Sequence, residues 1–347
     1  MKYSSTHKRK VRGELVHDDI SKKNIELKRK SEDTKKQEEL KRKNPEEIEE
    51  VTRKEVESVY LTPKIENFVE TKSVKNIENR VKLWLNTGYP VHIIGPTGCG
   101  KTTVAMHVAK ELGHPVVWIN GDEQITTTDL IGGYSQVETE SLRDKYIHNV
   151  FKSKDIVKAN WVDNPLTLAC RYGYTLVYNE FSRTRADANN ILLSVLAEGI
   201  LELPTKSVDE DRYVKVHPNF NLILTSNSVE YAGVHRPQDA LLDRTIGIYM
   251  DFYDFNTEVK IIKAHTGISH YEARDIVKVV RALREKLPEA QKPGTRAGIM
   301  VARGIMASDK HDIEDKNQFY IDILATKVKN PTDLHEKQKL INEILKS

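Results

Sequence analysis

Residues 95–102 read GPTGCGKT, a segment that fits the spacing G-x-x-x-x-G-K-[S/T]. It follows the apolar run VHIIG at 91–95 and leads into the helical pattern TTVAMHVAKELG at 102–113. A phosphate-binding P-loop requires this strand–loop–helix context, because its glycines let backbone N–H groups turn toward phosphates at the positive end of a helix. The segment therefore predicts a nucleotide site on an α/β sheet.

The same loop supplies the predicted contacts to ATP and Mg²⁺. We expect the nucleotide to be held by a continuous run of residues: Gly95, Pro96, Thr97, Gly98, Cys99, Gly100, Lys101, Thr102 and Thr103. Lys101 is expected to reach the β- and γ-phosphates, and Thr102 to offer its hydroxyl to Mg²⁺. Cys99 is expected to fill space, since no histidine or second cysteine lies nearby in sequence to activate it.

Five short apolar runs predict the strands of the sheet. They are VHIIG (91–95), PVVWING (115–121), TLVYNE (175–180), FNLILTSN (220–227) and TIGIYMD (245–251). Such runs suit strands buried on both faces of a parallel sheet, and helical patterns lie between them. We expect an α/β P-loop NTPase fold with a doubly wound, parallel five-stranded sheet over residues 60–255. ILEL (200–203) and YVKV (213–216) predict an inserted β-hairpin before the fourth strand.

Beyond residue 255 the strand signals stop and helical patterns continue. Four segments carry them: NTEVKIIKAHTG (256–267), YEARDIVKVVRALREKL (271–287), RAGIMVARGIMAS (296–308) and KNQFYIDILATKV (316–328). We therefore expect a small all-α C-terminal domain over residues 256–347.

The first 59 residues differ from the rest in composition. Residues 1–43 carry 15 Lys/Arg against 8 Asp/Glu, with few hydrophobic side chains, so we expect residues 1–59 to form a charged, largely disordered arm. Within it, residues 44–60 favour a charged helix that begins after Asn44. Tyr3 is the only aromatic residue of the arm, so it offers no stacking platform and we do not expect nucleic acid as a partner.

Hydropathy argues against a membrane protein. The longest uninterrupted apolar runs are VVWI and IMVA, too short for a membrane-spanning helix, and the basic start MKYSSTHKRK leads into no apolar signal region. The chain has two cysteines, Cys99 and Cys170, which fits a reducing compartment. We expect a cytoplasmic protein without a membrane partner.

Polar residues follow two predicted strands where a nucleotide site needs them. TLVYNE ends in Asn179 and Glu180, where an acidic pair usually holds the metal shell and polarises the attacking water. Asn179 can contact Mg²⁺ through a bound water but has no charge, so we expect weaker metal binding. Glu180 is the candidate general base. Asn227, at the end of the next strand, either orients water against the γ-phosphate or only caps the strand.

The segments GPTGCGKT, TLVYNEF, TSN and LLDR, in that order, resemble AAA+ ATPases of the MoxR group. A finer resemblance, over about residues 65–305, is to the GvpN family of gas vesicle proteins. Three segments carry it: WVDNPLTLACRYG, TLVYNEFSRTRADANNILLSVLAEGILELP and YVKVHPNFNLILTSNSVEYAGVHRPQDALLDR. The family pattern has Asp where this chain has Asn179, a departure that puts the rate of hydrolysis in doubt more than ATP binding.

The resemblance implies roles for single residues. It makes Glu180 the Walker B catalytic acid, Asn227 the sensor-1 residue and Arg244 in LLDR an arginine finger for a neighbouring subunit. It makes Arg296, on a helical lid formed by the C-terminal domain, the sensor-2 arginine. Fixed arginines would stabilise the charge of phosphoryl transfer. Alternative roles stay open: an ion pair with Asp243 or another acid for Arg244, and a helix-surface cation for Arg296.

At the level of function, the resemblance implies a Mg-dependent ATPase, slow because of Asn179, that forms a homo-oligomeric ring. It would assist gas vesicle assembly by acting on other gas vesicle proteins, in the cytoplasm or on the vesicle. Two alternatives remain: a MoxR-type chaperone that activates a metalloenzyme, and a scaffold that binds ATP but hardly cleaves it. The segments 129–161 and 200–216 are candidate client contacts, including Tyr134, Tyr146 and Trp161, and ordinary packing is the alternative role for each of these residues.

Overall fold

The structure, a computed structural model, describes residues 65–143, 153–205, 212–228, 235, 237–311, 316–325 and 331–346. The chain divides into two units, Met1–Val59 and Tyr60–Ser347, and all described residues lie in the second. The predicted arm and its helix lie outside the described residues, as does Tyr146.

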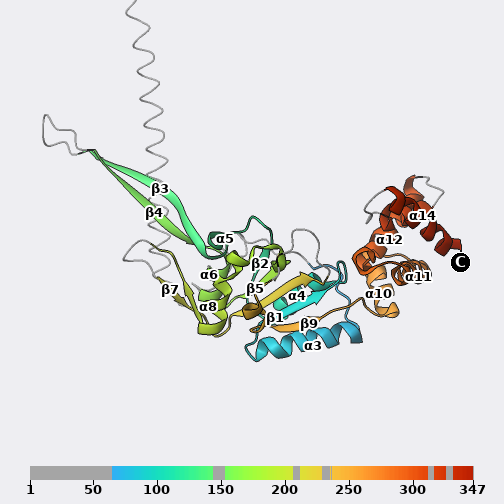
Figure 1. Cartoon of the computed structure of the whole chain (residues 1–347), viewed down its shortest axis with the longest axis horizontal. Coiled ribbons are helices and arrows are strands. Elements are labelled where there is room, and N and C mark those ends of the chain that lie inside the picture. Colours follow the sequence, from blue (N-terminus) through green and yellow to red (C-terminus); the bar gives the residue numbers. More distant parts are fainter. Residues whose placement is uncertain are drawn as a thin grey trace, which may run out of the picture. The chain divides into compact units, whose positions relative to one another are not determined.

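A parallel five-stranded sheet forms the core of the α/β part (Figure 1), as predicted. Its strands are β1 (Val91–Gly95), β2 (Val116–Asn120), β5 (Thr175–Asn179), β8 (Asn221–Asn227) and β9 (Ile246–Tyr249). They lie in the order β2-β5-β8-β1-β9, so β8 separates the P-loop strand from the strand that ends at Asn179. This order brings the carboxyl ends of β1, β5 and β8 to one edge, where ligands bind in open α/β sheets.

Helix α3 precedes the first strand, and further helices lie between the strands along the chain, as the alternating pattern predicts. They are α3 (Lys72–Asn86), α4 (Lys101–Glu111), α5 (Thr127–Ile131), α6 (Pro165–Tyr172), α7 (Ala186–Asn189), α8 (Ile191–Glu198) and α9 (Asp239–Leu242). Val104 and Val108 of α4 are buried in one core with Ile93, Val177 and Ile223 of the sheet. The helix that carries the P-loop lysine is therefore anchored on the strands that form the site.

Two antiparallel hairpins are inserted into the α/β part. Strands β6 (Ile200–Glu202) and β7 (Tyr213–Lys215) form the predicted one. The other, β3 (Gly132–Arg143) with β4 (Ser153–Asp163), was not expected as strands, and Figure 1 shows it as the longer of the two. At its base, the rings of Tyr134 and Trp161 pack edge to face, with centroids 5.4 Å apart. These two half-buried side chains therefore contact each other.

The described C-terminal residues are helical, with a hydrophobic core of their own. The helices are α10 (Phe255–Thr266), α11 (His270–Lys286), α12 (Thr295–His311), α13 (Asn317–Leu324) and α14 (Pro331–Lys346). Their shared core includes Val259, Ile276, Val280, Val301 and Ile341. Helix α14 lies within the predicted all-α domain, but its largely polar sequence is not one of the four segments with a predicted helical pattern.

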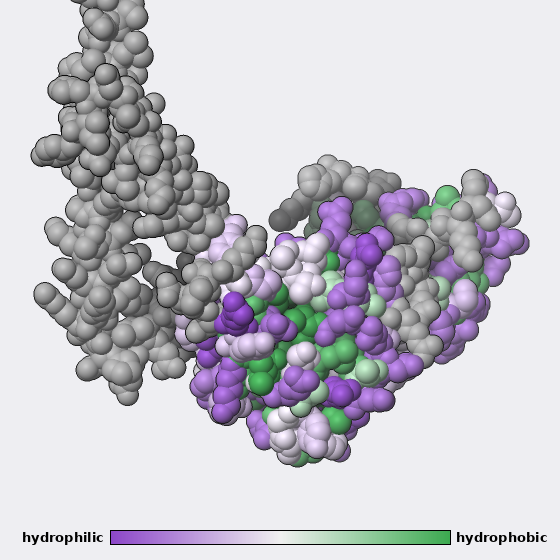
Figure 2. Space-filling view, turned by 60° about the vertical axis from the view of Figure 1, so that its left-hand side comes forward, coloured by the Kyte–Doolittle hydropathy of each residue, from purple (hydrophilic) through white to green (hydrophobic). Residues whose placement is uncertain are grey.

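Hydrophilic side chains dominate the face seen in Figure 2, around a central hydrophobic area. Among the described residues, no helix combines the length and the apolar composition that a bilayer-spanning segment needs.

Candidate nucleotide-binding site

The P-loop, residues 95–102, has a backbone that requires glycine at several positions. Gly98 and Gly100 have φ angles of +80° and +102°, in the left-handed region that side chains disfavour. A Cβ atom at Gly95 would lie 2.0 Å from the carbonyl oxygen of Met250, just beyond β9. The glycines thus create the close backbone curvature that a phosphate group needs, directly before the N-terminus of α4.

Lys101 lies buried at the base of this loop. Its ammonium donates hydrogen bonds to the carbonyl oxygens of Gly95 (2.9 Å) and Pro96 (2.8 Å) and to the side-chain oxygen of Asn227 (2.9 Å). Burial lowers the pKa of this ammonium, as does, to a smaller extent, the charge of Arg296. Lys101 and Asn227, which the sequence places 126 residues apart, thus share one point of the site.

Asn179 forms a polar network at the end of β5. Its side-chain oxygen accepts hydrogen bonds from the hydroxyls of Thr102 (2.7 Å) and Thr225 (2.8 Å). Its NH₂ group donates to the side-chain oxygen of Asn120, at the end of β2, over 2.7 Å. The amide is therefore fixed with its oxygen toward the P-loop and its nitrogen toward β2.

Glu180 has the unusual backbone that often marks a functional position. Its φ angle is +50°, left-handed for a residue with a Cβ. The Glu180 amide donates to the hydroxyl of Thr225 (3.1 Å), and a Cβ at Gly121 would lie 2.3 Å from the Glu180 carbonyl oxygen. The Glu180 side chain is one-third exposed and forms an ion pair with Arg183 at 3.2 Å. Neighbouring strands thus hold the backbone while the carboxylate stays accessible.

The helical part contributes a second wall to the site. A Cβ at Gly294 would lie 2.6 Å from the carbonyl oxygen of Thr97, so the turn before α12 packs closely on the P-loop backbone. Arg284 holds this turn, since its Nε donates to the carbonyl oxygen of Pro293 over 2.6 Å. The Arg284 guanidinium also forms a buried, two-point pair with Glu258, at 2.6 and 3.0 Å, and Glu258 accepts from Thr295 at 2.8 Å.

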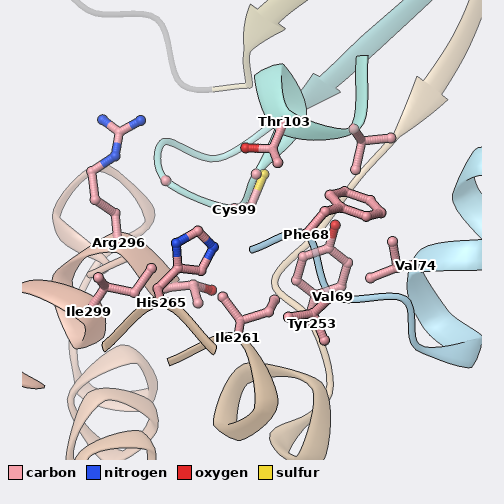
Figure 3. Close-up of a pocket in the computed structure, with 14 residues that line it drawn as sticks. Phe68, Val69, Val74, Cys99, Thr103, Tyr253, Ile261, His265, Arg296 and Ile299 are labelled. Atoms are coloured by element: carbon pink, nitrogen blue, oxygen red, sulfur yellow. The ribbon is translucent and has the colours of Figure 1, made fainter. Parts of the chain in front are cut away.

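Between these walls lies a cavity of about 240 Å³. Its lining includes Phe68, Gly98, Cys99, Thr103, Tyr253, His265, Arg296 and Ile299. In Figure 3, Cys99 and Thr103 face His265 across the cavity, and the Arg296 side chain extends away from it. Burial, together with the charge of Arg303, lowers the pKa of His265, which favours the neutral ring. An apolar cavity beside a phosphate loop suits the base and sugar of a nucleotide.

Both cysteines of the chain are buried. Burial raises the pKa of the Cys99 thiol and raises that of Cys170 to about 12. The interpretation of Cys99 as a space-filling residue agrees with this environment.

The structure brings most of the predicted site residues to one edge of the sheet: the P-loop, Lys101, Thr102, Asn179, Glu180 and Asn227. Arg296 adjoins them from the helical part, where it lines the cavity with an exposed side chain. Arg244 is exposed, and its Nη1 donates to the carbonyl oxygen of Ala240 at 2.7 Å. Among the described residues it forms no ion pair with Asp243.

Three residues of the site were missed in the sequence: Asn120, Gly121 and Thr225. A signal existed for the first two, because the dipeptide Asn-Gly directly follows an apolar run and therefore lies at the ligand-binding edge of the sheet. Thr225 stands in the segment TSN, but nothing in one sequence shows that its hydroxyl joins two neighbouring strands.

The residues fit Mg-ATP on physical grounds. The P-loop glycines allow a tight backbone turn beside a buried ammonium, and a Cβ at Gly95 would block that turn. Oxygen ligands of the type that Mg²⁺ prefers are present at Thr102 and Asn179. Glu180, one-third exposed, adds a carboxylate at the same edge.

Comparisons with known proteins agree with this geometry. Residues 90–245 match the AAA domain (dynein-related subfamily). The chain is 55% identical to the gas vesicle ATPase GvpN of Haloferax mediterranei, covering 82% of this chain and 81% of the relative. It is 52% identical to the gas vesicle ATPase GvpN1 of Halobacterium salinarum, covering 95% and 94%. A more distant relative is protein NorQ of Paracoccus denitrificans, 26% identical over 56% of this chain and 64% of that protein.

These identities, over more than four-fifths of both relatives' length, confirm the resemblance seen in the motifs. With an AAA domain on a parallel five-stranded sheet, the chain belongs to the GvpN family of gas vesicle AAA+ ATPases.

Proposed function

We propose that the chain binds and slowly hydrolyses Mg-ATP, and that it uses this activity as an assembly factor for gas vesicles. The observation that carries the proposal is the P-loop with its buried Lys101, whose ammonium donates three hydrogen bonds, to the carbonyl oxygens of Gly95 and Pro96 and to the side chain of Asn227. A lysine held between two loop carbonyls and Asn227 can turn toward a phosphate without leaving the site. Its buried charge would then be compensated by the nucleotide.

In this proposal each residue at the sheet edge has its own task. Bound Mg²⁺ would neutralise part of the phosphate charge. Thr102 and Asn179 would hold its coordination shell, Asn179 through a water molecule. Glu180 would take the proton of the attacking water, and Asn227 would orient that water. Asn179 offers a neutral oxygen, so the metal shell is held by one charge fewer than with Asp, which is why we propose a slow rate.

The arginines would complete the site from two directions. Arg296, on the wall formed by α12, would act on the same subunit's nucleotide as the sensor-2 residue. Arg244 is exposed two residues after α9, so its guanidinium could exchange the Ala240 carbonyl for the nucleotide of a neighbouring copy in a homo-oligomeric ring. Both would stabilise the charge that spreads over the γ-phosphate.

The role in gas vesicles rests on the relatives' names, at 52–55% identity. Other gas vesicle proteins would be the clients, contacted by the β3–β4 and β6–β7 hairpins, and the protein would act in the cytoplasm or on the vesicle. The MoxR-type chaperone role has weaker support, since NorQ is 26% identical. The nucleotide-dependent scaffold remains a second candidate, favoured by one specific observation, the neutral Asn179 at the metal site.

Two variants test the enzymatic part. Lys101→Ala should abolish ATP binding, whereas Glu180→Gln should retain bound ATP and lose hydrolysis by about 10²-fold or more. The measurement is a single-turnover assay with labelled ATP on purified, assembled protein. Unchanged turnover in Glu180→Gln would remove this residue as the base, and absence of turnover in the natural chain would favour the scaffold.

The biological part needs a test in cells. A strain that carries Lys101→Ala should lack gas vesicles in light scattering and microscopy, while the matched surface change Lys110→Ala should keep them. Normal vesicles in the Lys101→Ala strain would contradict the assembly role while leaving the ATPase activity to be judged by the assay above.

A further inference from the structure

A histidine–carboxylate cluster with one buried member, Glu78, lies between α3 and α4, on residues that no part of the proposed ATPase mechanism uses. It consists of Glu78 on α3 and of His107 and Glu111 on α4. The Nδ1 atom of His107 lies 2.6 Å from Oε1 of Glu78 and 3.4 Å from Oε2 of Glu111. One nitrogen and two carboxylate oxygens, all within 4.8 Å of one another, therefore converge on a single point.

Two atoms of this cluster are buried without a hydrogen bond. Glu78 is only 3% exposed, and neither its Oε1 nor Nδ1 of His107 has a hydrogen-bond partner among the described residues. The two atoms are in contact, but they are not aligned as donor and acceptor. A carboxylate oxygen that is buried without a hydrogen bond is costly, and an ion or another ligand at this point would satisfy it.

The imidazole is held in a fixed orientation. Its ring stacks on Phe68 with centroids 3.7 Å apart and planes 10° from parallel. Glu111 stands four residues after His107 on the same helix, the spacing that places two ligands on one face of a helix. A ligand set on two anchored helices, with one ring fixed by stacking, is preorganised in the way metal sites require.

The charge balance around the cluster favours a cation. The charged groups that face it are Glu70, Lys75, Glu78, Lys82 and Glu111. Three carboxylates against two ammonium groups leave a net charge of about −1 when His107 is neutral. Lys82 forms an ion pair with Glu111, and Lys75 with Glu70, so the buried Glu78 is the carboxylate without a lysine partner.

From these observations we propose that Glu78, His107 and Glu111 bind a divalent transition-metal ion of the Zn²⁺ type. An imidazole nitrogen with two carboxylate oxygens is a ligand set that Zn²⁺ accepts and that Mg²⁺, which prefers oxygen ligands in octahedral geometry, does not. The site is therefore distinct from the Mg-ATP site at the P-loop. Glu111 would exchange its contact with Lys82 for the metal.

The position of the cluster gives the ion a structural consequence. His107 stacks on Phe68, and Phe68 also lines the nucleotide cavity, in which it is one of the labelled side chains of Figure 3. An ion that fixes the His107 ring would therefore also fix this wall of the cavity. The rival explanation is a protonated His107 that forms an ion pair with Glu78 and binds no metal.

Cobalt(II) is a suitable probe, because its visible absorption reports the ligands directly without any nucleotide. Full-length protein, free of nucleotide, would be titrated with Co²⁺ and then with Zn²⁺ in competition. We expect a saturable spectrum with one ion per chain that Zn²⁺ displaces. His107→Gln and Glu111→Gln should each weaken binding by at least about tenfold, since each removes one of three ligands.

The matched control is His270→Gln, an exposed histidine at the start of α11, which should bind Co²⁺ like the natural chain. The control matters because the chain has other histidines, such as His7 and His17. Glu78→Gln alters a buried side chain, so the test rests on the two partly exposed ligands, with circular dichroism to verify folding. Equal Co²⁺ affinity in His107→Gln, Glu111→Gln and the natural chain, or no saturable binding, would overturn the proposal and favour the ion pair.

Discussion

The hydroxyl of Thr102 donates a 2.7 Å hydrogen bond to the side-chain oxygen of Asn179, which joins the residue after the P-loop lysine directly to the end of β5. Because the Asn179 NH₂ group is in turn bound to Asn120, the amide cannot rotate without breaking two contacts. The Asn179 side-chain oxygen is therefore fixed toward the P-loop. An aspartate at position 179 would place an oxygen at the same point but with a negative charge.

Restoring that charge should strengthen metal binding. We expect Asn179→Asp to lower the Mg²⁺ concentration for half-maximal ATPase activity by about tenfold and to raise turnover, because affinity follows the charge of the ligands. Asn120 can keep its contact by turning its NH₂ group toward the new carboxylate. The measurement is steady-state ATPase activity across a Mg²⁺ titration. Asn190→Asp, which adds the same charge at an exposed position, serves as the control; equal behaviour of both variants would rule out a role of Asn179 in metal binding.

The buried pair of Glu258 and Arg284 should be essential for stability. Arg284→Met leaves the Glu258 carboxylate, 1% exposed, without its main partner, and should lower the free energy of unfolding by about 3–5 kcal/mol. The double variant with Glu258→Gln should lose less than the sum of the single variants, since it removes the unpaired charge as well. Urea denaturation of the natural chain, the two single variants and the double variant provides a double-mutant cycle. Strictly additive losses in the free energy of unfolding would argue against a coupled pair.

Gly294 should matter for nucleotide affinity through its contact with the P-loop. A Cβ there would lie 2.6 Å from the Thr97 carbonyl oxygen and 2.8 Å from Gly98, so Gly294→Ala must push the turn before α12 away from the loop. We expect ATP affinity to fall by about tenfold, with a loss of stability of about 1–3 kcal/mol. Gly247→Ala is the comparison, since its Cβ would meet no atom closer than 3.8 Å. Isothermal titration with ATP measures both, and equal affinities would refute the steric argument.

His92 should make the fold sensitive to mild acid. Burial lowers the pKa of this histidine from 6.5 to about 4, and its Nε2 lies 2.7 Å from the Ser226 hydroxyl. Between these two values the unfolded chain binds the proton more readily, so stability is full above pH 6.5 and is lost as the pH falls toward 4. The loss attributable to this group is about 3 kcal/mol. His92→Gln should flatten the dependence of the unfolding free energy on pH between 7 and 4.5, and an unchanged slope would exclude His92 as its source.

Much of the fold could be predicted because its strands are short apolar runs that end in polar site residues. All five core strands and the β6–β7 hairpin lie where these runs stand. Because parallel strands joined by helical crossovers bring their carboxyl ends to one edge of the sheet, the polar residues at these ends are expected to lie close together. This is why Lys101, Asn179 and Asn227 could be assigned to one site from sequence alone.

The rest escaped prediction for physical reasons. The sequence GGYSQVETESLR of β3 lacks regular alternation of apolar and polar residues, and its pairing with β4 is a long-range contact that no local pattern reveals. Helix α14 is largely polar, and its Ile341 becomes buried only through packing on the other helices. The Asn120–Asn179 bond depends on side-chain orientation at two strand ends, which periodicity does not encode.

The burial of both native thiols also makes the protein convenient for chemical mapping of the assembly. Cys99 and Cys170 are both buried in the folded chain, and their raised pKa values suppress the reactive thiolate. Tyr213 is exposed on the β6–β7 hairpin, so a cysteine introduced there would react faster with thiol reagents than the two buried native cysteines. Crosslinkers or fluorophores attached at this point can identify what the hairpin touches during vesicle formation without first removing the cysteine from the P-loop.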